Sequence, residues 1–285
     1  MNKSVFQELY FKAFKSGNRL FLFIGINTLV FLTLGLIATT EWLFLRNTPS
    51  ANWLQQQLSV PASLQVLPYR VWSLLTYMFS HRNLFHFFFN MLGLYWLGTI
   101  FLDFLNKRQF TFTYLAGGFS GALLYILFYN IFPAFKSAVP DSDLIGASAS
   151  VMAIVVAAAT LVPDFTIRLM LIGNIRLKYL ALIYVIVNIL SIVGENAGGC
   201  IAHLGGSLLG YIYIKALQNG NDWSKIFQKK SKLKVVQSNK SSSQSNNKLP
   251  DQEVIDKILD KISISGYDSL SRSEKEQLFN ASKEK

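Results

Sequence analysis

Long apolar stretches constrain this chain more than any other feature of its sequence. Several approach or exceed about 18 residues with few charges, the length that a helix needs to cross a hydrocarbon core of about 30 Å. Lipid offers no partner for backbone N–H and C=O groups, so such stretches must form helices. The pattern predicts an all-α membrane protein built as a six-transmembrane-helix bundle. The expected spans are residues 20–38, 82–102, 110–132, 145–162, 179–193 and 200–217.

The net charge is strongly positive, at +11. In a soluble protein this would indicate nucleic-acid binding, but here much of the excess lies in the two tails and in short loops. Basic residues beside spans set orientation and favour anionic lipid head groups. We therefore expect membrane lipids as partners, no nucleic acid, and both termini in the cytoplasm. A signal peptide is the competing interpretation of the first stretch, which is long for one and has no A-x-A site after it.

Composition divides the chain into a cytoplasmic N-terminal tail (1–19), the membrane domain (20–217), a flexible basic linker (218–250) and a small cytoplasmic helical hairpin (251–285). The linker is rich in Lys, Ser, Asn and Gln and cannot build a core. In the last part, Gly266 breaks a helical pattern, and Ser271 with Glu274 resembles a capping box for a second helix. Disorder is the alternative for this part.

Two loops are expected to touch the membrane surface. Residues 39–71 form a long outer connection with tryptophans and apolar patches too short to span, which predicts an amphipathic segment in the interface. A simple folded loop is the alternative. The cytoplasmic connection at 163–178 carries an apolar patch, LMLIG, that is also expected to dip into the interface.

Metal and disulfide chemistry find little support in the sequence. Cys200 is the only cysteine, so no intrachain disulfide forms, and we expect it to be a small buried residue. The three histidines, His81, His86 and His203, are dispersed, and neither HExxH nor CxxC occurs. We expect no metal and no cofactor.

Four polar side chains are expected at one depth, near the outer face of the bilayer. His86 and Asn90 share one face in the first turns of the second span, Ser148 lies in the first turn of the fourth, and His203 lies in the first turn of the sixth. All three helices start at the outer face. Polar groups inside a membrane are costly and tend to face one another or a water-filled cavity. Their shared depth predicts a site.

A serine and a histidine in such a site can perform nucleophilic catalysis. The histidine removes the hydroxyl proton and later protonates the leaving amine. The tetrahedral oxyanion needs fixed donors, which His86, Asn90 and a backbone N–H near a helix start would supply. No Asp or Glu is placed to complete a triad, so the pattern predicts a Ser148–His203 dyad.

Helix packing is the alternative for each of these residues taken alone. Small residues four apart, such as Gly146 and Ser150, favour close helix contact, and Gly206 with Gly210 does the same in the sixth span. A competing serine, Ser120, lies in a GFSG string near the middle of the third span. That depth is wrong for contact with the histidine, so we expect it not to be the nucleophile.

Three motifs resemble those of the rhomboid intramembrane serine proteases. The resemblance covers roughly residues 70–216. The motifs are HFFFN at 86–90, like the family's HxxxN; GASA at 146–149, like GxSG; and AHLGGSLLG at 202–210, like AHxxGxxxG. They occur in order and on the expected helices, which makes the resemblance highly specific.

The resemblance implies a rhomboid-like bundle with Ser148 as nucleophile and His203 as base. It implies an oxyanion hole formed by His86, Asn90 and the Ser148 backbone N–H. It also implies that His81 lines the path by which water enters.

Some positions depart from the family pattern. Ala149 replaces the last glycine of GxSG, which is expected to tighten helix packing without removing the nucleophile. Met152 stands where many members have an aromatic ring against the catalytic histidine, so the orientation of His203 is less determined. Arg70-Val-Trp72 replaces the common Trp-Arg pair of the first loop.

The sequence therefore predicts an intramembrane serine endopeptidase that cleaves single-span membrane proteins near the outer face. The low cysteine count and compact core point to a bacterial inner membrane. A non-catalytic rhomboid-like binder or escort is the alternative, against which the intact Ser148 and His203 argue. A small transporter is a further alternative, but no internal repeat supports it.

Overall fold

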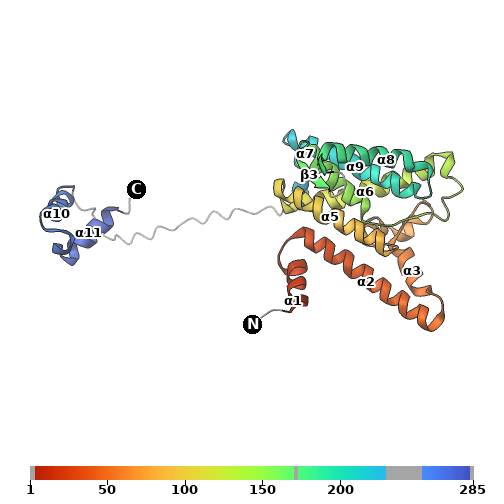
Figure 1. The fold of residues 1–285 in the computed structure, drawn as a ribbon, viewed down its shortest axis with the longest axis horizontal. Helices are drawn as coiled ribbons and strands as arrows, with labels where there is room; N and C mark the ends of the chain where they lie inside the picture. The colour runs from red at the N-terminus through yellow and green to blue at the C-terminus, as the bar shows by residue number, and fades with distance from the viewer. Residues whose placement is uncertain (1–3, 170–172, 229–251, 283–285) are drawn as a thin grey trace. The chain divides into compact units, whose positions relative to one another are not determined.

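The computed structural model describes residues 4–169, 173–228 and 252–282 (Figure 1). The chain divides into two compact units, residues 1–229 and 230–285. The α-helices of the first unit are α1 (Val5–Tyr10), α2 (Arg19–Leu45), α3 (Pro49–Leu58), α4 (Ser73–Thr76), α5 (Leu84–Phe104), α6 (Lys107–Ile131), α7 (Ser148–Leu161), α8 (Leu177–Leu190) and α9 (Ala197–Gln218). Its strands are β1 (Val60–Pro61), β2 (Asp143–Leu144), β3 (Thr166–Leu169) and β4 (Gly173–Arg176).

Four helices in the described part of the chain, α2, α5, α6 and α9, are long and apolar enough to cross a membrane. Two shorter apolar helical stretches, Ser148–Leu161 and Leu177–Val193, lie where the fourth and fifth spans are expected. The predicted all-helical membrane class is confirmed, whereas the count of six spans stays a prediction. Helix α2 runs beyond its predicted end at residue 38 to Leu45, and α9 begins three residues earlier than predicted.

Helix α7 is the most enclosed helix of the bundle and packs against α5, α6, α8 and α9. Every residue from Ala149 to Ala159 is buried. Because neighbouring helices cover it on all sides, its 14 residues need not match the length of a lipid-facing span.

Glycines let two helices approach α7 closely. A Cβ built on Gly206 of α9 would lie 2.8 Å from the carbonyl carbon of Ala149, and closer still to its oxygen. A Cβ on Gly210 would lie 3.0 Å from the carbonyl carbon of Ala153. On the α6 side, a Cβ on Gly121 would lie 2.6 Å from the Cβ of Ala149. Gly121 therefore makes room for the methyl group that departs from the GxSG pattern, and Gly206 makes room for the Ala149 backbone.

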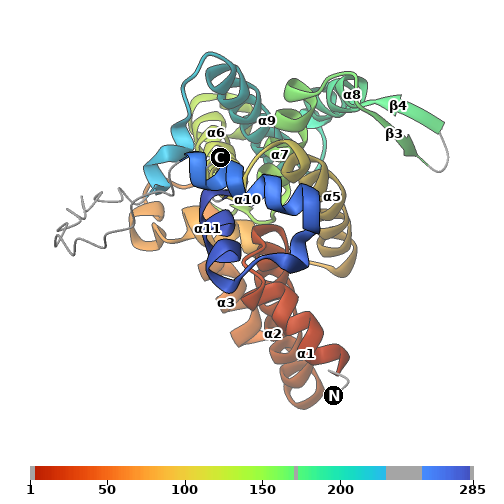
Figure 2. The ribbon, with the colours of Figure 1, turned by 90° about the vertical axis from the view of Figure 1, so that its left-hand side faces the viewer.

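Short strands tie the loops of this unit to the bundle. In the outer connection, β1 pairs antiparallel with β2, with Val60 opposite Leu144, and so holds the segment that leads into α7. Strands β3 and β4 form an antiparallel hairpin between α7 and α8 that the sequence pattern did not predict (Figure 2). Residues 170–172, the centre of the LMLIG patch, lie outside the described residues.

Hydrogen bonds to the Asp222 carboxylate join the end of α9 to the start of α6. Asp222 follows α9, and its Oδ2 accepts a hydrogen bond from Arg108 Nη2 of α6 at 2.7 Å. Its Oδ1 accepts from Tyr213 Oη at 3.0 Å, from Ser224 N at 3.0 Å and from Ser224 Oγ at 2.6 Å. The Asp222 side chain is 10% exposed, so this ion pair is largely shielded from water.

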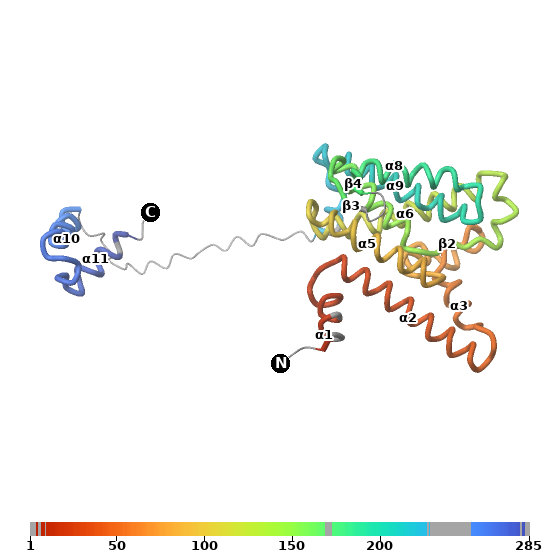
Figure 3. The backbone as a smooth tube through the Cα atoms, in the orientation of Figure 1, coloured from red at the N-terminus to blue at the C-terminus, as the bar shows by residue number. Residues whose placement is uncertain are grey.

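The second unit contains two helices, α10 (Gln252–Ser265) and α11 (Arg272–Ser282), traced in blue in Figure 3. Gly266 separates them with φ of 77°, a left-handed conformation that glycine adopts without strain. The Ser271 N–H donates to Glu274 Oε2 at 2.7 Å, and the Glu274 N–H donates to Ser271 Oγ at 3.3 Å. These two bonds are the reciprocal pattern of a capping box.

Candidate active site

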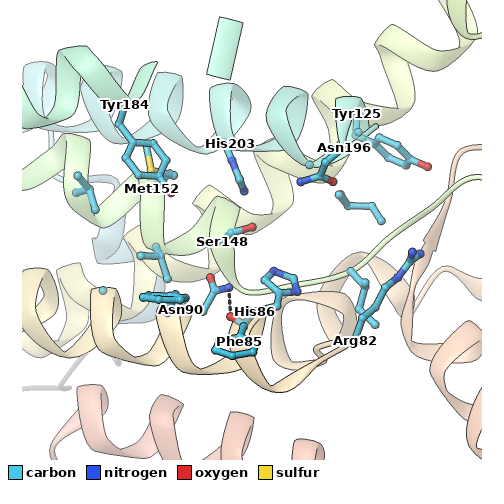
Figure 4. Close-up of a pocket in the computed structure, with 18 of the residues that line it drawn as sticks. Arg82, Phe85, His86, Asn90, Tyr125, Ser148, Met152, Tyr184, Asn196 and His203 are labelled. Carbon is cyan, nitrogen blue, oxygen red and sulfur yellow. Dashed lines mark hydrogen bonds between the residues drawn. The ribbon is translucent and has the colours of Figure 1, made fainter. Parts of the chain in front are cut away.

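A cavity of about 880 Å³ opens among α5, α7, α8 and α9 and the segment before α7 (Figure 4). The four side chains predicted to share one depth, His86, Asn90, Ser148 and His203, all line it. Apolar side chains, among them Met152 of α7, line the part of the cavity between the helices. The structure thus brings residues from three separate stretches of sequence into one chamber.

Ser148 is the first residue of α7, so its backbone N–H belongs to the turn in which helix donors lack intrahelical partners. Two residues earlier, Gly146 has φ of 128°, which L side chains rarely adopt. A Cβ there would also lie 2.6 Å from Cε1 and 2.8 Å from Nε2 of the His86 ring. Glycine at 146 therefore lets the segment before the serine pass directly against His86.

The start of α5 fixes the other two polar groups. Asn83 caps the helix, because its Oδ1 accepts the His86 N–H at 2.8 Å. One turn on, Asn90 Nδ2 donates to the His86 carbonyl at 2.7 Å (Figure 4). An amide nitrogen carries two hydrogens, so the second N–H of Asn90 stays available to the cavity.

His203 lies almost two turns inside α9 and not in its first turn, because the helix already begins at Ala197. Its ring points toward Ser148 (Figure 4), and no hydrogen bond joins the two side chains among the contacts of the described residues. Such bonds are often long in a free enzyme and tighten with substrate. The ring nitrogen Nδ1 lies 2.6 Å from Oδ1 of Asn188 on α8.

Charged and polar groups gather at the end of the cavity near β2. Arg82 lines it and donates from Nη2 to the Asp143 carbonyl at 3.3 Å. Burial raises the pKa of the Asp143 carboxyl, although Arg70, whose Nη1 is 3.9 Å away, acts in the opposite direction. Asn196, at the start of α9, lines the same end. The rim of the chamber at this end therefore carries both charged and amide side chains.

Comparison with known families identifies the membrane unit. The Rhomboid domain family model matches residues 68–219, more than half of the chain. The chain belongs to the rhomboid family. Residues 244–284 match a second model, described as a family of unknown function (DUF6576). A search of curated proteins found no match.

The competing serine of this rhomboid has a packing role. Ser120 of α6 donates from Oγ to the Gly205 carbonyl of α9 at 2.9 Å and does not line the cavity. Its neighbour Gly118 approaches Met78 and Ser150, where a Cβ would lie 2.6 Å from each side chain. The GFSG string is thus a helix-contact motif.

His81 lies beside the chamber and not among the residues that line it. Its side chain is 3% exposed, and its Nε2 accepts the Ala147 N–H at 3.5 Å. The His81 ring meets the His86 ring edge-on, with centroids 5.1 Å apart. These contacts brace the segment before Ser148, and a role in admitting water stays a prediction.

Two residues near the histidine were not singled out from the sequence. Tyr184 of α8 lines the cavity, with its ring centroid 6.5 Å from that of His203. Asn188, one turn further along α8, is 5% exposed. A signal for Asn188 was present, since it is a polar residue within an apolar span, and such residues are functional candidates by default.

Proposed function

We propose that this rhomboid-family membrane protein is a serine endopeptidase that cleaves peptide bonds of membrane-spanning proteins. The observation that carries the proposal is the single chamber lined by Ser148, His203, His86 and Asn90. A nucleophile, a base and oxyanion donors are the parts that acyl transfer requires. No metal or other cofactor is needed for this chemistry.

The proposed reaction begins when His203 takes the proton from Ser148 Oγ as the oxygen attacks the scissile carbonyl carbon. The oxyanion that forms is stabilised by His86, by the second N–H of Asn90 and by the Ser148 backbone N–H. His203 then gives its proton to the leaving amine, and the C–N bond breaks. His203 next takes a proton from a water molecule as the water oxygen attacks the acyl-enzyme carbonyl. The ester bond to Ser148 Oγ then breaks, the new carboxyl product leaves, and His203 gives the proton back to Ser148 Oγ.

We propose that substrates are single-span proteins cut near the outer face, with both termini of the enzyme in the cytoplasm of a bacterial cell and its bundle in the inner membrane. The charge distribution supports this orientation, because basic residues gather in the two tails. Substrate helices that unwind easily are favoured, since an intact helix shields its peptide bonds. The polar rim near Arg82 supports water access from the same side.

The test is cleavage of a single-span substrate in proteoliposomes by the wild type, Ser148→Ala and Ser120→Ala, with fluorophosphonate labelling of each. Ser120→Ala is the matched control, because it removes a hydroxyl from the same bundle outside the chamber. We expect cleavage and labelling to be lost only in Ser148→Ala. Activity that survives in Ser148→Ala would refute the assignment. A wild type that neither cleaves nor labels would favour the non-catalytic escort.

A further inference from the structure

The Asn188 side chain is the hydrogen-bond partner of the His203 ring. Its Oδ1 lies 2.6 Å from Nδ1, and this is the one hydrogen bond of the ring among the described residues. Asn188 is 5% exposed, so water does not compete for the contact. Helix α8, which carries Asn188, and helix α9, which carries His203, pack against each other.

A second bond determines which end of the amide faces the histidine. Asn188 Nδ2 donates to the carbonyl of Tyr184, four residues earlier in α8, at 2.8 Å. The amide oxygen is therefore left for His203. A flipped amide would place its N–H₂ group beside the ring and its oxygen against the Tyr184 carbonyl, where two acceptors would repel each other.

The amide orientation in turn selects the tautomer of the histidine. An amide oxygen only accepts hydrogen bonds, so Nδ1 of His203 must carry the hydrogen. In the neutral ring the lone pair then lies on Nε2. A general base for Ser148 needs that lone pair on the nitrogen that faces the serine, and the other nitrogen held by an acceptor.

The hydrogen bond to Asn188 matters more here because Met152 replaces the aromatic ring that many family members place against the histidine. Met152 of α7 offers no aromatic face to the histidine, and the Tyr184 ring lies 6.5 Å away at a tilt of 58°. Ring stacking therefore does not hold His203 in place here. A short hydrogen bond at Nδ1 constrains both the position and the rotation of the ring.

We propose that Asn188 is a positioning residue that holds His203 as the Nδ1–H tautomer, with Nε2 free to accept the proton of Ser148. The role is the one that a buried carboxylate has in Ser-His-Asp triads, performed by a neutral amide from another helix. It rests on the proposed function, since it assigns a task to a residue of that same site.

The first test is kinetic and uses full-length protein in proteoliposomes. Asn188→Leu removes the acceptor at nearly constant volume, and we expect kcat to fall by about 10- to 1000-fold with KM within about threefold. Asn188→Asp retains an acceptor oxygen and should be at least about tenfold more active than Asn188→Leu. Asn27→Leu is the matched control, because Asn27 of α2 is buried and makes the same bond to the carbonyl four residues earlier. It does not line the chamber and should keep wild-type kcat.

The second test reads the tautomer directly. Nitrogen-15 shifts of labelled histidine in micelles distinguish a protonated from an unprotonated ring nitrogen, and His203→Ala assigns the His203 signals. We expect Nδ1 protonated and Nε2 unprotonated in the wild type and in Asn27→Leu, and a tautomer mixture in Asn188→Leu.

Either test can overturn the inference. A wild-type ring protonated at Nε2, or an Asn188→Leu variant with kcat within threefold of Asn27→Leu, would refute it. Equal losses in Asn188→Leu and Asn188→Asp would refute it as well. An inactive wild type with Nδ1 protonated would instead refute the proposed function while leaving the hydrogen bond in place, so the two failures are distinguishable.

Discussion

Replacing Gly206 by alanine should disturb the site without touching a reacting group. The new Cβ would lie 2.8 Å from the carbonyl carbon of Ala149, whereas ordinary contact begins at 3.4 Å. Helix α9 must therefore withdraw from α7 by about 0.6 Å at that carbon, and by more at the oxygen, which puts the displacement on the order of 1 Å. Ala149 directly follows Ser148, and Gly206 lies one turn after His203. The spacing of the dyad would widen by a similar amount.

A misplacement of this size costs about 100-fold in rate in well-aligned active sites, and overpacking costs about 1–3 kcal/mol of stability. We expect both losses in Gly206→Ala, measured as kcat in proteoliposomes and as thermal unfolding in detergent. Gly35→Ala is the control, because nothing lies within 4 Å of a Cβ at Gly35 of α2. It should keep full activity and the unfolding temperature of the wild type. If Gly206→Ala cleaves within threefold of the wild type, the packing argument is wrong.

Three further predictions concern other parts of the chain. Gly146→Ala forces an L residue to φ of 128°, which should cost about 1–3 kcal/mol and abolish cleavage; fluorophosphonate labelling at the wild-type rate would contradict this. Asp222→Asn breaks the ion pair with Arg108 and should lower the free energy of unfolding by about 2–3 kcal/mol. The loss is smaller than for a fully buried pair because the arginine side chain is 28% exposed. An unchanged melting temperature would contradict this prediction. The Ser271 N–H lowers the pKa of the Glu274 carboxyl from its ordinary value of 4.5 to about 2. The cap should therefore stabilise the helical hairpin fully above about pH 4.5 and lose this effect as the pH falls toward 2. The Ser271 amide resonance should titrate near pH 2 in the full-length chain.

Several features of the fold and site could be predicted because they depend on local chemistry. Long apolar runs require helices in lipid, whatever the tertiary packing, so the all-helical membrane class followed from the sequence. Polar residues in such runs are costly, which singled out His86, Asn90, Ser148 and His203 before their distances were known. The rejection of Ser120 followed from its depth in a helix, and its bond to the Gly205 carbonyl agrees with that.

Other features depend on how helices pack and could not be predicted. Asn188 becomes a candidate positioning residue only because α8 brings it within 2.6 Å of His203, a distance that no spacing within one helix encodes. The effect of Ala149 was open for the same reason, since Gly121, which makes room for its methyl group, and Gly206, which lies against its backbone, come from two other helices.

The sequence by itself determined that this chain enters a membrane as helices, and it singled out four polar residues that line one cavity in the structure. Both results follow from the free energy of placing polar groups in hydrocarbon, which acts on each helix separately. The tertiary structure decided which atoms meet: the His86 ring against Gly146, and the His203 ring against Asn188. Those contacts depend on the relative rotation and spacing of packed helices. Short-range side-chain contacts across the bundle determine that rotation and spacing.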